Sequence, residues 1–145
     1  MRYYLDTEFN GFGGNLISLA LVSEEGRELY VATLCPFPAK WVEQNVLPIV
    51  KCPGAEPIMI DHRHFGQAIA IFLTGDPAPT IISDWPDDVR FFCESIVTGP
   101  GQMVSIPSLQ FEVRRIDAYP TDLAHAVQHN ALWDARALRH AIEKP

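Results

Sequence analysis

The sequence predicts an α/β fold in which a mixed five-stranded sheet is flanked by helices. Three β-rich segments follow one another directly at the start of the chain, and the remainder alternates between helical and β patterns. Consecutive strands joined by tight turns pair antiparallel, whereas strands joined through a helix usually pair parallel. We therefore expect three antiparallel strands followed by parallel ones.

The first three strands lie in the N-terminal quarter of the chain. Residues 2–6 are rich in tyrosine and leucine, and residues 16–23 form an almost continuous apolar run. A Glu25-Gly26 turn separates that run from the β-rich residues 28–34, which is typical of a hairpin.

Two helices are predicted in the next segment. A stretch punctuated by prolines leaves room for a short helix at residues 39–46, which Pro48 ends. A longer helix begins after Asp61, a preferred N-cap residue, and extends to Gly75. Its apolar residues recur at helical spacing: Phe65, Ile69, Phe72 and Leu73.

The second half of the chain alternates between strand and helix. Residues 80–83 form a short β-branched run, typical of a strand covered on both faces. Pro86 opens a helix whose first turn favours the acids Asp87 and Asp88. Residues 109–116 alternate like a strand, and the C-terminal segment is helical. The apolar stripes of these two helices are Val89, Phe92, Cys93 and Ile96, and Leu132, Ala135, Leu138 and Ile142.

Length and composition favour one globular domain spanning residues 1–145, because 48% of the residues are hydrophobic and 20% are charged. No apolar run is long enough for a membrane helix and no signal sequence is evident, so we expect a cytoplasmic protein. The net charge of −7 argues against a broad electrostatic grip on nucleic acid. That objection weakens where clustered acids hold cations, because bound metal reverses the local field.

Two acidic residues at the end of the first strand indicate a metal site. Side chains alternate along a strand, so Asp6 and Glu8 share one face while Thr7 and Phe9 point to the other. Carboxylates this close repel each other unless a cation neutralises them, and hard divalent ions prefer oxygen ligands. Asp84 directly follows the 80–83 strand, so it joins the pair if the two strands are neighbours.

A histidine and an acid near the C-terminus complete the candidate site. On one continuous helix His129 and Asp134 would lie on different faces. Asn130 is a preferred N-cap, which places His129 in the loop before the helix and Asp134 in its first turns. Both side chains can then face one cleft. Taken singly, each of these patterns is more often a solvated strand end or a chance pair.

Together the three segments resemble the motifs of the DEDDh 3′-to-5′ exonucleases. These are LDTEF with Asp6 and Glu8, ISDWPDDV with Asp84, and HNALWD with His129 and Asp134. The chain is most similar to the small RNase AS-type exoribonucleases, in its size and its Asp-Trp-Pro segment. The resemblance implies a ribonuclease-H-like fold in which Asp6, Glu8, Asp84 and Asp134 hold two Mg²⁺ or Mn²⁺ ions and His129 is the general base.

The same resemblance implies a substrate. A chain of this family would release nucleoside monophosphates from the 3′ end of single-stranded RNA, with an adenylate preference, and would form a homodimer. Phe9 and Thr7 would contact the terminal nucleotide, and Trp85 would lie beside it. Alternation along the strand equally allows Phe9 to enter the core, and Trp85 to be a packing wall.

Further alternatives stay open at the level of sequence. The same residues suit a DNA exonuclease, an oligonucleotide scavenger, or a nucleic-acid-binding module without turnover. The acids also suit a hydrated strand edge on a non-enzymatic domain. Four arginines provide a modest supply of positive charge, or are simply exposed: Arg114, Arg115, Arg136 and Arg139.

Overall fold

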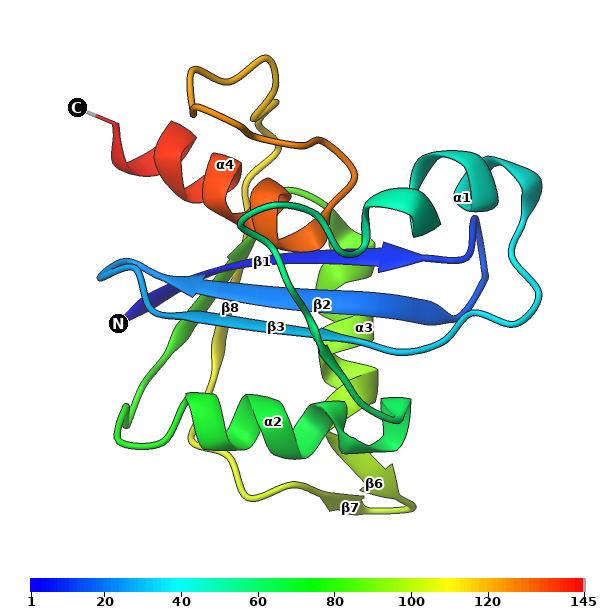
Figure 1. The fold of residues 1–145 in the computed structure, drawn as a ribbon. Helices are drawn as coiled ribbons and strands as arrows, with labels where there is room; N and C mark the ends of the chain where they lie inside the picture. Colours follow the sequence, from blue (N-terminus) through cyan, green and yellow to red (C-terminus); the bar gives the residue numbers. More distant parts are fainter. Residues whose placement is uncertain (145) are drawn as a thin grey trace.

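A six-stranded mixed sheet forms the centre of the computed structural model, which describes residues 1–144 (Figure 1). The strand order is β4-β3-β2-β1-β5-β8. Strands β1, β2 and β3 pair antiparallel, whereas β5 pairs parallel with both β1 and β8, and β4 pairs parallel with β3. The strands are β1 (Arg2–Phe9), β2 (Leu16–Ser23), β3 (Glu28–Ala32), β4 (Ile58–Met59), β5 (Thr80–Ser83) and β8 (Gln110–Val113).

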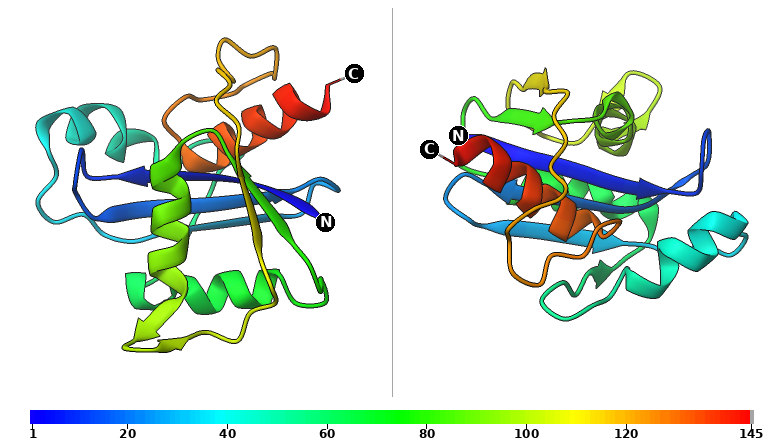
Figure 2. Two further views of the ribbon diagram at one scale, coloured as in Figure 1. Left: turned by 180° about the vertical axis from the view of Figure 1, so that it is seen from behind. Right: turned by 90° about the horizontal axis from the view of Figure 1, so that it is seen from above.

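Helices cover both faces of this sheet. Figure 1 shows α4 above the strands and α2 below them, and the reverse view in Figure 2 shows α3 crossing the same side as α2. The helices are α1 (Lys40–Asn45), α2 (Phe65–Phe72), α3 (Pro86–Ile96) and α4 (Ala131–Glu143), with two short 3₁₀ turns, η1 (Leu47–Ile49) and η2 (His62–His64). A small ribbon of β6 (Val97–Gly99) and β7 (Gln102–Met103) follows α3.

The predicted α/β class, with antiparallel strands first and parallel strands after them, is confirmed. The sheet has six strands instead of the five expected, because β4 adds a two-residue edge strand. A strand that short contains no alternation from which a sequence could predict it. Asp61 caps the short turn η2, accepting a hydrogen bond from the Arg63 N–H, and α2 begins only at Phe65.

The core lies on both faces of the central strands, and all eight residues of β2 are buried. On one face the aromatic and branched side chains of β1 and β2 pack against Phe65 of α2 and Phe92 of α3. On the other face α4 packs against β2 and β3 through the small residues Ala131 and Ala135. Small side chains let a helix approach a sheet closely, so α4 brings its first turn against the middle strands.

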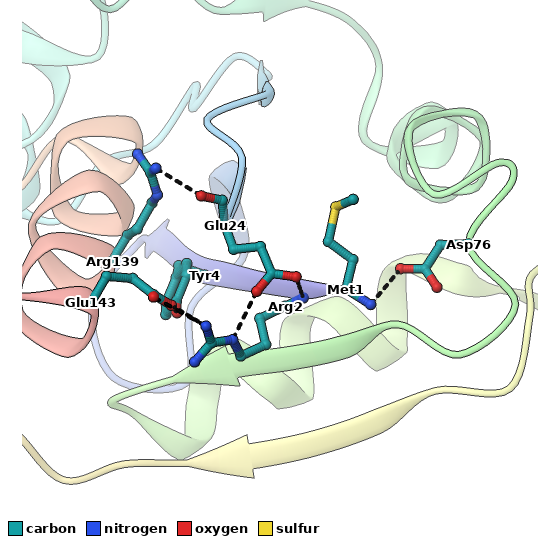
Figure 3. A network of polar contacts seen from close by, with 7 residues as sticks. All are labelled: Met1, Arg2, Tyr4, Glu24, Asp76, Arg139 and Glu143. Atoms are coloured by element: carbon teal, nitrogen blue, oxygen red, sulfur yellow. Dashed lines mark hydrogen bonds and ion pairs between the residues drawn. The ribbon is translucent and has the colours of Figure 1, made fainter.

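A polar network fixes the start of β1 to the end of α4 (Figure 3). Arg2 pairs with Glu24 and with Glu143, each at 3.0 Å, and the Tyr4 hydroxyl also contacts Glu143. Arg139 of α4 donates to the Glu24 carbonyl oxygen at 2.8 Å. Exposed ion pairs contribute at most ~1 kcal/mol each, so the network mainly sets the orientation of the helix on the strand.

Within residues 1–144, no helix has the length and apolar character needed to cross a bilayer.

Candidate active site

The pairing of β1 with β5 places Asp6 beside Asp84. In the parallel register Tyr4 lies opposite Ile82, so two residues further on Asp6 is level with Asp84, just beyond the end of β5. The neighbouring strands assumed in the sequence interpretation are thus observed. Carboxylate oxygens of Asp6, Asp84 and Asp88 lie within 4.8 Å of one another.

A second group forms around the N-terminus of α4. Ligand atoms of Glu8, His129 and Asp134 also lie within 4.8 Å of one another. Asn130 is the N-cap of α4, and its side-chain oxygen accepts the Trp133 N–H at 3.0 Å. This confirms that the histidine precedes the helix, which is the arrangement that allows the two side chains to meet.

Both groups line one cavity of about 360 Å³ at the carboxyl ends of β1 and β5. The irregular segment 114–130 forms much of the remaining wall and passes over the sheet beside α4 (Figure 1). Six acids line the cavity: Asp6, Glu8, Asp84, Asp88, Asp117 and Asp134. The structure therefore brings all five predicted catalytic side chains into a single cavity, together with further acids.

The sequence interpretation missed two of the lining acids, the exposed Asp117 and the buried Asp88, and Asp88 is the one held firmly in the site. It is only 2% exposed, and its Oδ1 accepts the Thr7 N–H at 3.2 Å and the Thr7 hydroxyl at 2.6 Å. Its Oδ2 accepts the Ser83 hydroxyl at 2.7 Å. Its position in the sequence, four residues after Asp84, could have indicated this place. Side chains of a helix lean toward its N-terminus, so an acid in the first turn of α3 points back at the end of β5.

Burial and mutual repulsion raise the pKa values of these acids. Burial, with the charges of Asp134 and Asp88, raises the pKa of Glu8 to about 9. Burial is also the main cause that raises the pKa values of Asp88 and Asp134 to about 7 each. Asp6 has a pKa well above its usual range, first because of burial and then because of the neighbouring carboxylates. Several of these carboxylates cannot be charged together at neutral pH without a cation.

Two of the carboxylates contain buried oxygens without a donor. Neither Asp6 Oδ2 nor Asp134 Oδ1 has a hydrogen-bond partner among residues 1–144. A buried unpaired oxygen is destabilising unless something else binds it. The set of ligands, carboxylate oxygens with one imidazole, is of the kind that Mg²⁺ and Mn²⁺ bind. The residues present therefore fit divalent cations.

His129 occupies an unusual backbone conformation at the entrance of α4. Its φ is 68°, in the left-handed region, and its N–H donates to Asp134 Oδ2 at 2.9 Å. The ring of Trp41 on α1 contacts the His129 ring edge to face, with centroids 5.0 Å apart. No sequence pattern predicts this contact, because nothing local indicates where α1 packs. Strained residues held by several partners often occur at functional sites.

The three candidate substrate residues all lie on the cavity wall, in different settings. Thr7 is buried, and its hydroxyl is engaged with Asp88. Phe9 follows a register shift after Glu8 and is half-buried, with its ring 4.9 Å from Phe91. Trp85 is 47% exposed. The Phe9 side chain thus packs toward the core, and one part of the same residue borders the cavity.

The fold and this cavity define an α/β protein with a carboxylate-lined site. Over 61 residues the chain is 39% identical to two curated proteins of Mycobacterium tuberculosis, from strains CDC 1551 / Oshkosh and ATCC 25618 / H37Rv. Each of these proteins is named a 3′-5′ exoribonuclease. The similar region covers 39% of this chain and 36% of each relative, so it spans little more than a third of their length. No family model matches the chain. The similarity supports a relationship to 3′-5′ exonucleases.

Proposed function

We propose that this chain is a metal-dependent 3′-to-5′ exoribonuclease of the DEDDh type, similar to the RNase AS-type enzymes. It would release nucleoside monophosphates from the 3′ ends of single-stranded RNA. The observation that supports this best is the single cavity lined by six acids and His129, with buried carboxylate oxygens that have no donor within residues 1–144. The similarity to two proteins named 3′-5′ exoribonuclease supports the direction and the substrate class.

In this proposal Asp6, Glu8, Asp84 and Asp134 hold two divalent cations, Mg²⁺ or Mn²⁺. When bound, such ions stabilise charge on the attacking and leaving oxygens of a phosphodiester displacement. Asp88 lies in the group with Asp6 and Asp84, so it can supply a further carboxylate oxygen. Its bonds from Thr7 and Ser83 fix the carboxylate in one orientation, which preorganises the site.

His129 is the proposed general base. A neutral imidazole can accept a proton from water at a ring nitrogen. The backbone hydrogen bond from His129 to Asp134 joins the base to a proposed metal ligand. A shift of one would therefore move the other, so the general base and this metal ligand would stay aligned.

The substrate would enter as a single strand. A cavity of about 360 Å³ is at the small end of ligand sites, which suits one terminal nucleotide better than a duplex end. Phe9 and Trp85 offer aromatic surface on its wall, and bases or sugars can stack on such surfaces. Thr7 would act through Asp88. The RNA 2′-hydroxyl can distinguish RNA from DNA at such a site.

The direct test uses single-stranded RNA oligomers labelled at the 5′ end, incubated with Mn²⁺ or Mg²⁺ and resolved nucleotide by nucleotide. We expect a ladder of products shortened one nucleotide at a time from the 3′ end, abolished by EDTA and by Asp134→Asn. Glu25→Gln, at an exposed acid outside the cavity, is the matched control and should retain full activity. Internal cleavage, or activity that survives EDTA, would contradict the proposal.

Separate measurements test the base preference, the choice of RNA over DNA, and the oligomeric state. Oligomers that differ only in the 3′ nucleotide test the adenylate preference, and matched DNA oligomers test the choice of RNA. Light scattering on the purified protein tests the homodimer that the resemblance implies.

A further inference from the structure

Most of the positive charge in this protein is already neutralised. The chain contains 11 lysines and arginines. Seven of them form ion pairs with carboxylates within residues 1–144: Arg2, Lys51, Arg63, Arg90, Arg114, Arg136 and Lys144. Two more donate hydrogen bonds near the start of β1, Arg27 to the Tyr3 hydroxyl and Arg139 to the Glu24 carbonyl oxygen. Among the described residues this leaves Arg115 and Lys40.

The register between β5 and β8 places Arg115 at the rim of the acidic cavity. Val113 at the end of β8 pairs with Ser83 at the end of β5. Two residues further along each chain, Arg115 is level with Trp85. The Arg115 guanidinium lies 4.4 Å from the centre of the Trp85 ring, and Trp85 lines the cavity.

Trp85 is itself held in place under the guanidinium. Its backbone N–H donates to the Ser83 hydroxyl at 3.0 Å, and its indole N–H donates to Asp87 Oδ2 at 3.2 Å. A guanidinium stacked on an aromatic face keeps its N–H donors directed outward in the plane. Arg115 is exposed and, within residues 1–144, has no carboxylate partner within 4.0 Å, so those donors are available.

We propose that Arg115, stacked on Trp85, binds a backbone phosphate of single-stranded RNA at the rim of the acidic cavity. The inference deepens the proposed function and rests on it. A polyanion that approaches six carboxylates meets repulsion, and the arginine stacked on Trp85 provides local attraction. The arginine fork binds phosphate oxygens in a bidentate manner. The phosphate would be one on the 5′ side of the scissile linkage, because the cavity itself admits the terminal nucleotide.

Arg114 is the matched control, because it is adjacent in sequence yet its Nε is bound to Glu112 at 2.5 Å. The variants are Arg115→Ala, Arg115→Lys, Trp85→Ala and Arg114→Ala. Binding of a fluorescein-labelled ten-nucleotide oligoadenylate is measured by anisotropy in Ca²⁺ at several salt concentrations. Hydrolysis of the same RNA in Mn²⁺ provides kcat and KM.

We expect Arg115→Ala to raise Kd and KM about tenfold, as for the loss of one charge-assisted hydrogen bond, with kcat little changed. The slope of log Kd against log salt should fall by ~0.7, the value for one phosphate contact on a single strand. Arg115→Lys should keep that slope and recover part of the affinity, while Trp85→Ala should weaken binding severalfold. Arg114→Ala should change neither Kd nor the slope.

Equal effects of Arg115→Ala and Arg114→Ala would overturn the inference. So would a loss of kcat in Arg115→Ala with Kd and the salt slope unchanged. A parent protein that binds RNA in Ca²⁺ but never hydrolyses it refutes the proposed function, while its Kd still decides the role of Arg115. A parent protein that neither binds nor hydrolyses the RNA refutes both.

Discussion

Replacing Glu8 with glutamine should stabilise the metal-free protein at neutral and alkaline pH and leave its stability in acid unchanged. Burial and the charges of Asp134 and Asp88 raise the pKa of Glu8 from 4.5 to about 9. A carboxyl with a higher pKa in the folded protein holds its proton more tightly when folded. Its contribution to stability is complete below the unfolded pKa and is lost as the pH rises through the folded pKa.

The size of the effect follows from these two pKa values. At about pH 7.5 the unfolded carboxyl is ionised and the folded one is still protonated. The pH is then about three units above the unfolded pKa of 4.5, and each unit is worth ~1.36 kcal/mol. Folding the wild-type chain thus costs ~4 kcal/mol at Glu8, a cost that glutamine avoids. For a domain of this size that difference corresponds to roughly 10 °C in Tm.

The assay is thermal unfolding of the wild type and Glu8→Gln in EDTA, from about pH 5 to about pH 9. The difference in Tm should be near zero in acid and should grow steadily with pH. Mn²⁺ should raise the Tm of the wild type, most of all at high pH, and should have a much smaller effect on Glu8→Gln, because a proposed ligand is missing. Glu25→Gln, at an exposed acid, should follow the wild type throughout.

A Tm difference that does not depend on pH would refute this reasoning, because it would show that Glu8 has the same pKa folded and unfolded. A Glu8→Gln protein that is less stable than the wild type in EDTA at about pH 8 would refute it more directly.

Three other changes follow from the contacts of the site. Thr7→Val removes the 2.6 Å hydrogen bond from the Thr7 hydroxyl to Asp88, so we expect the free energy of unfolding in urea to fall by ~2 kcal/mol. Because the pKa of Asp88 is about 7, the fall should be larger above pH 7 than in acid, and an equal fall at both would contradict this. Asn130→Ala removes the cap of α4 and the 2.8 Å hydrogen bond to the Ile49 carbonyl oxygen. The free energy of unfolding in urea should fall by ~3 kcal/mol, and a fall under ~1 kcal/mol would count against this. Trp41→Ala frees the His129 ring and should lower kcat. Trp41→Phe should recover most of the rate, and a change in KM alone would exclude this role.

Local rules are sufficient to predict much of the site from the sequence. Alternation along a strand places Asp6 and Glu8 on one face, whatever the rest of the chain does. The N-cap preference of Asn130 separates His129 from the helix that carries Asp134. These predictions need only a few neighbouring residues, and the structure agrees with the local geometry of each.

The parts that sequence reasoning missed depend on register between distant strands. Asp88 enters the site because the first turn of α3 brings its carboxylate between Thr7 of β1 and Ser83 of β5, and Arg115 lies over Trp85 because β8 stops level with β5. Trp41 reaches His129 because α1 packs beyond the end of the sheet. A shift of one residue in the pairing of β5 with β1 or β8 would turn the side chains of the shifted strand to the other face. The sequence alone does not determine that register.

Under the proposed function, the buried acids also explain how a chain with a net charge of −7 acts on a polyanion. Without cations, some of the carboxyls stay protonated in the folded protein, which reduces the repulsion between them. The raised pKa values of Glu8, Asp88 and Asp134 indicate this. Binding of divalent cations would displace those protons and reverse the sign of the local field. The affinity of the metal should therefore rise with pH, and the affinity for RNA should rise with it. If RNA binding in Ca²⁺ instead weakened between about pH 6 and about pH 8, the acids would be repelling the substrate and the metal-centred account would fail.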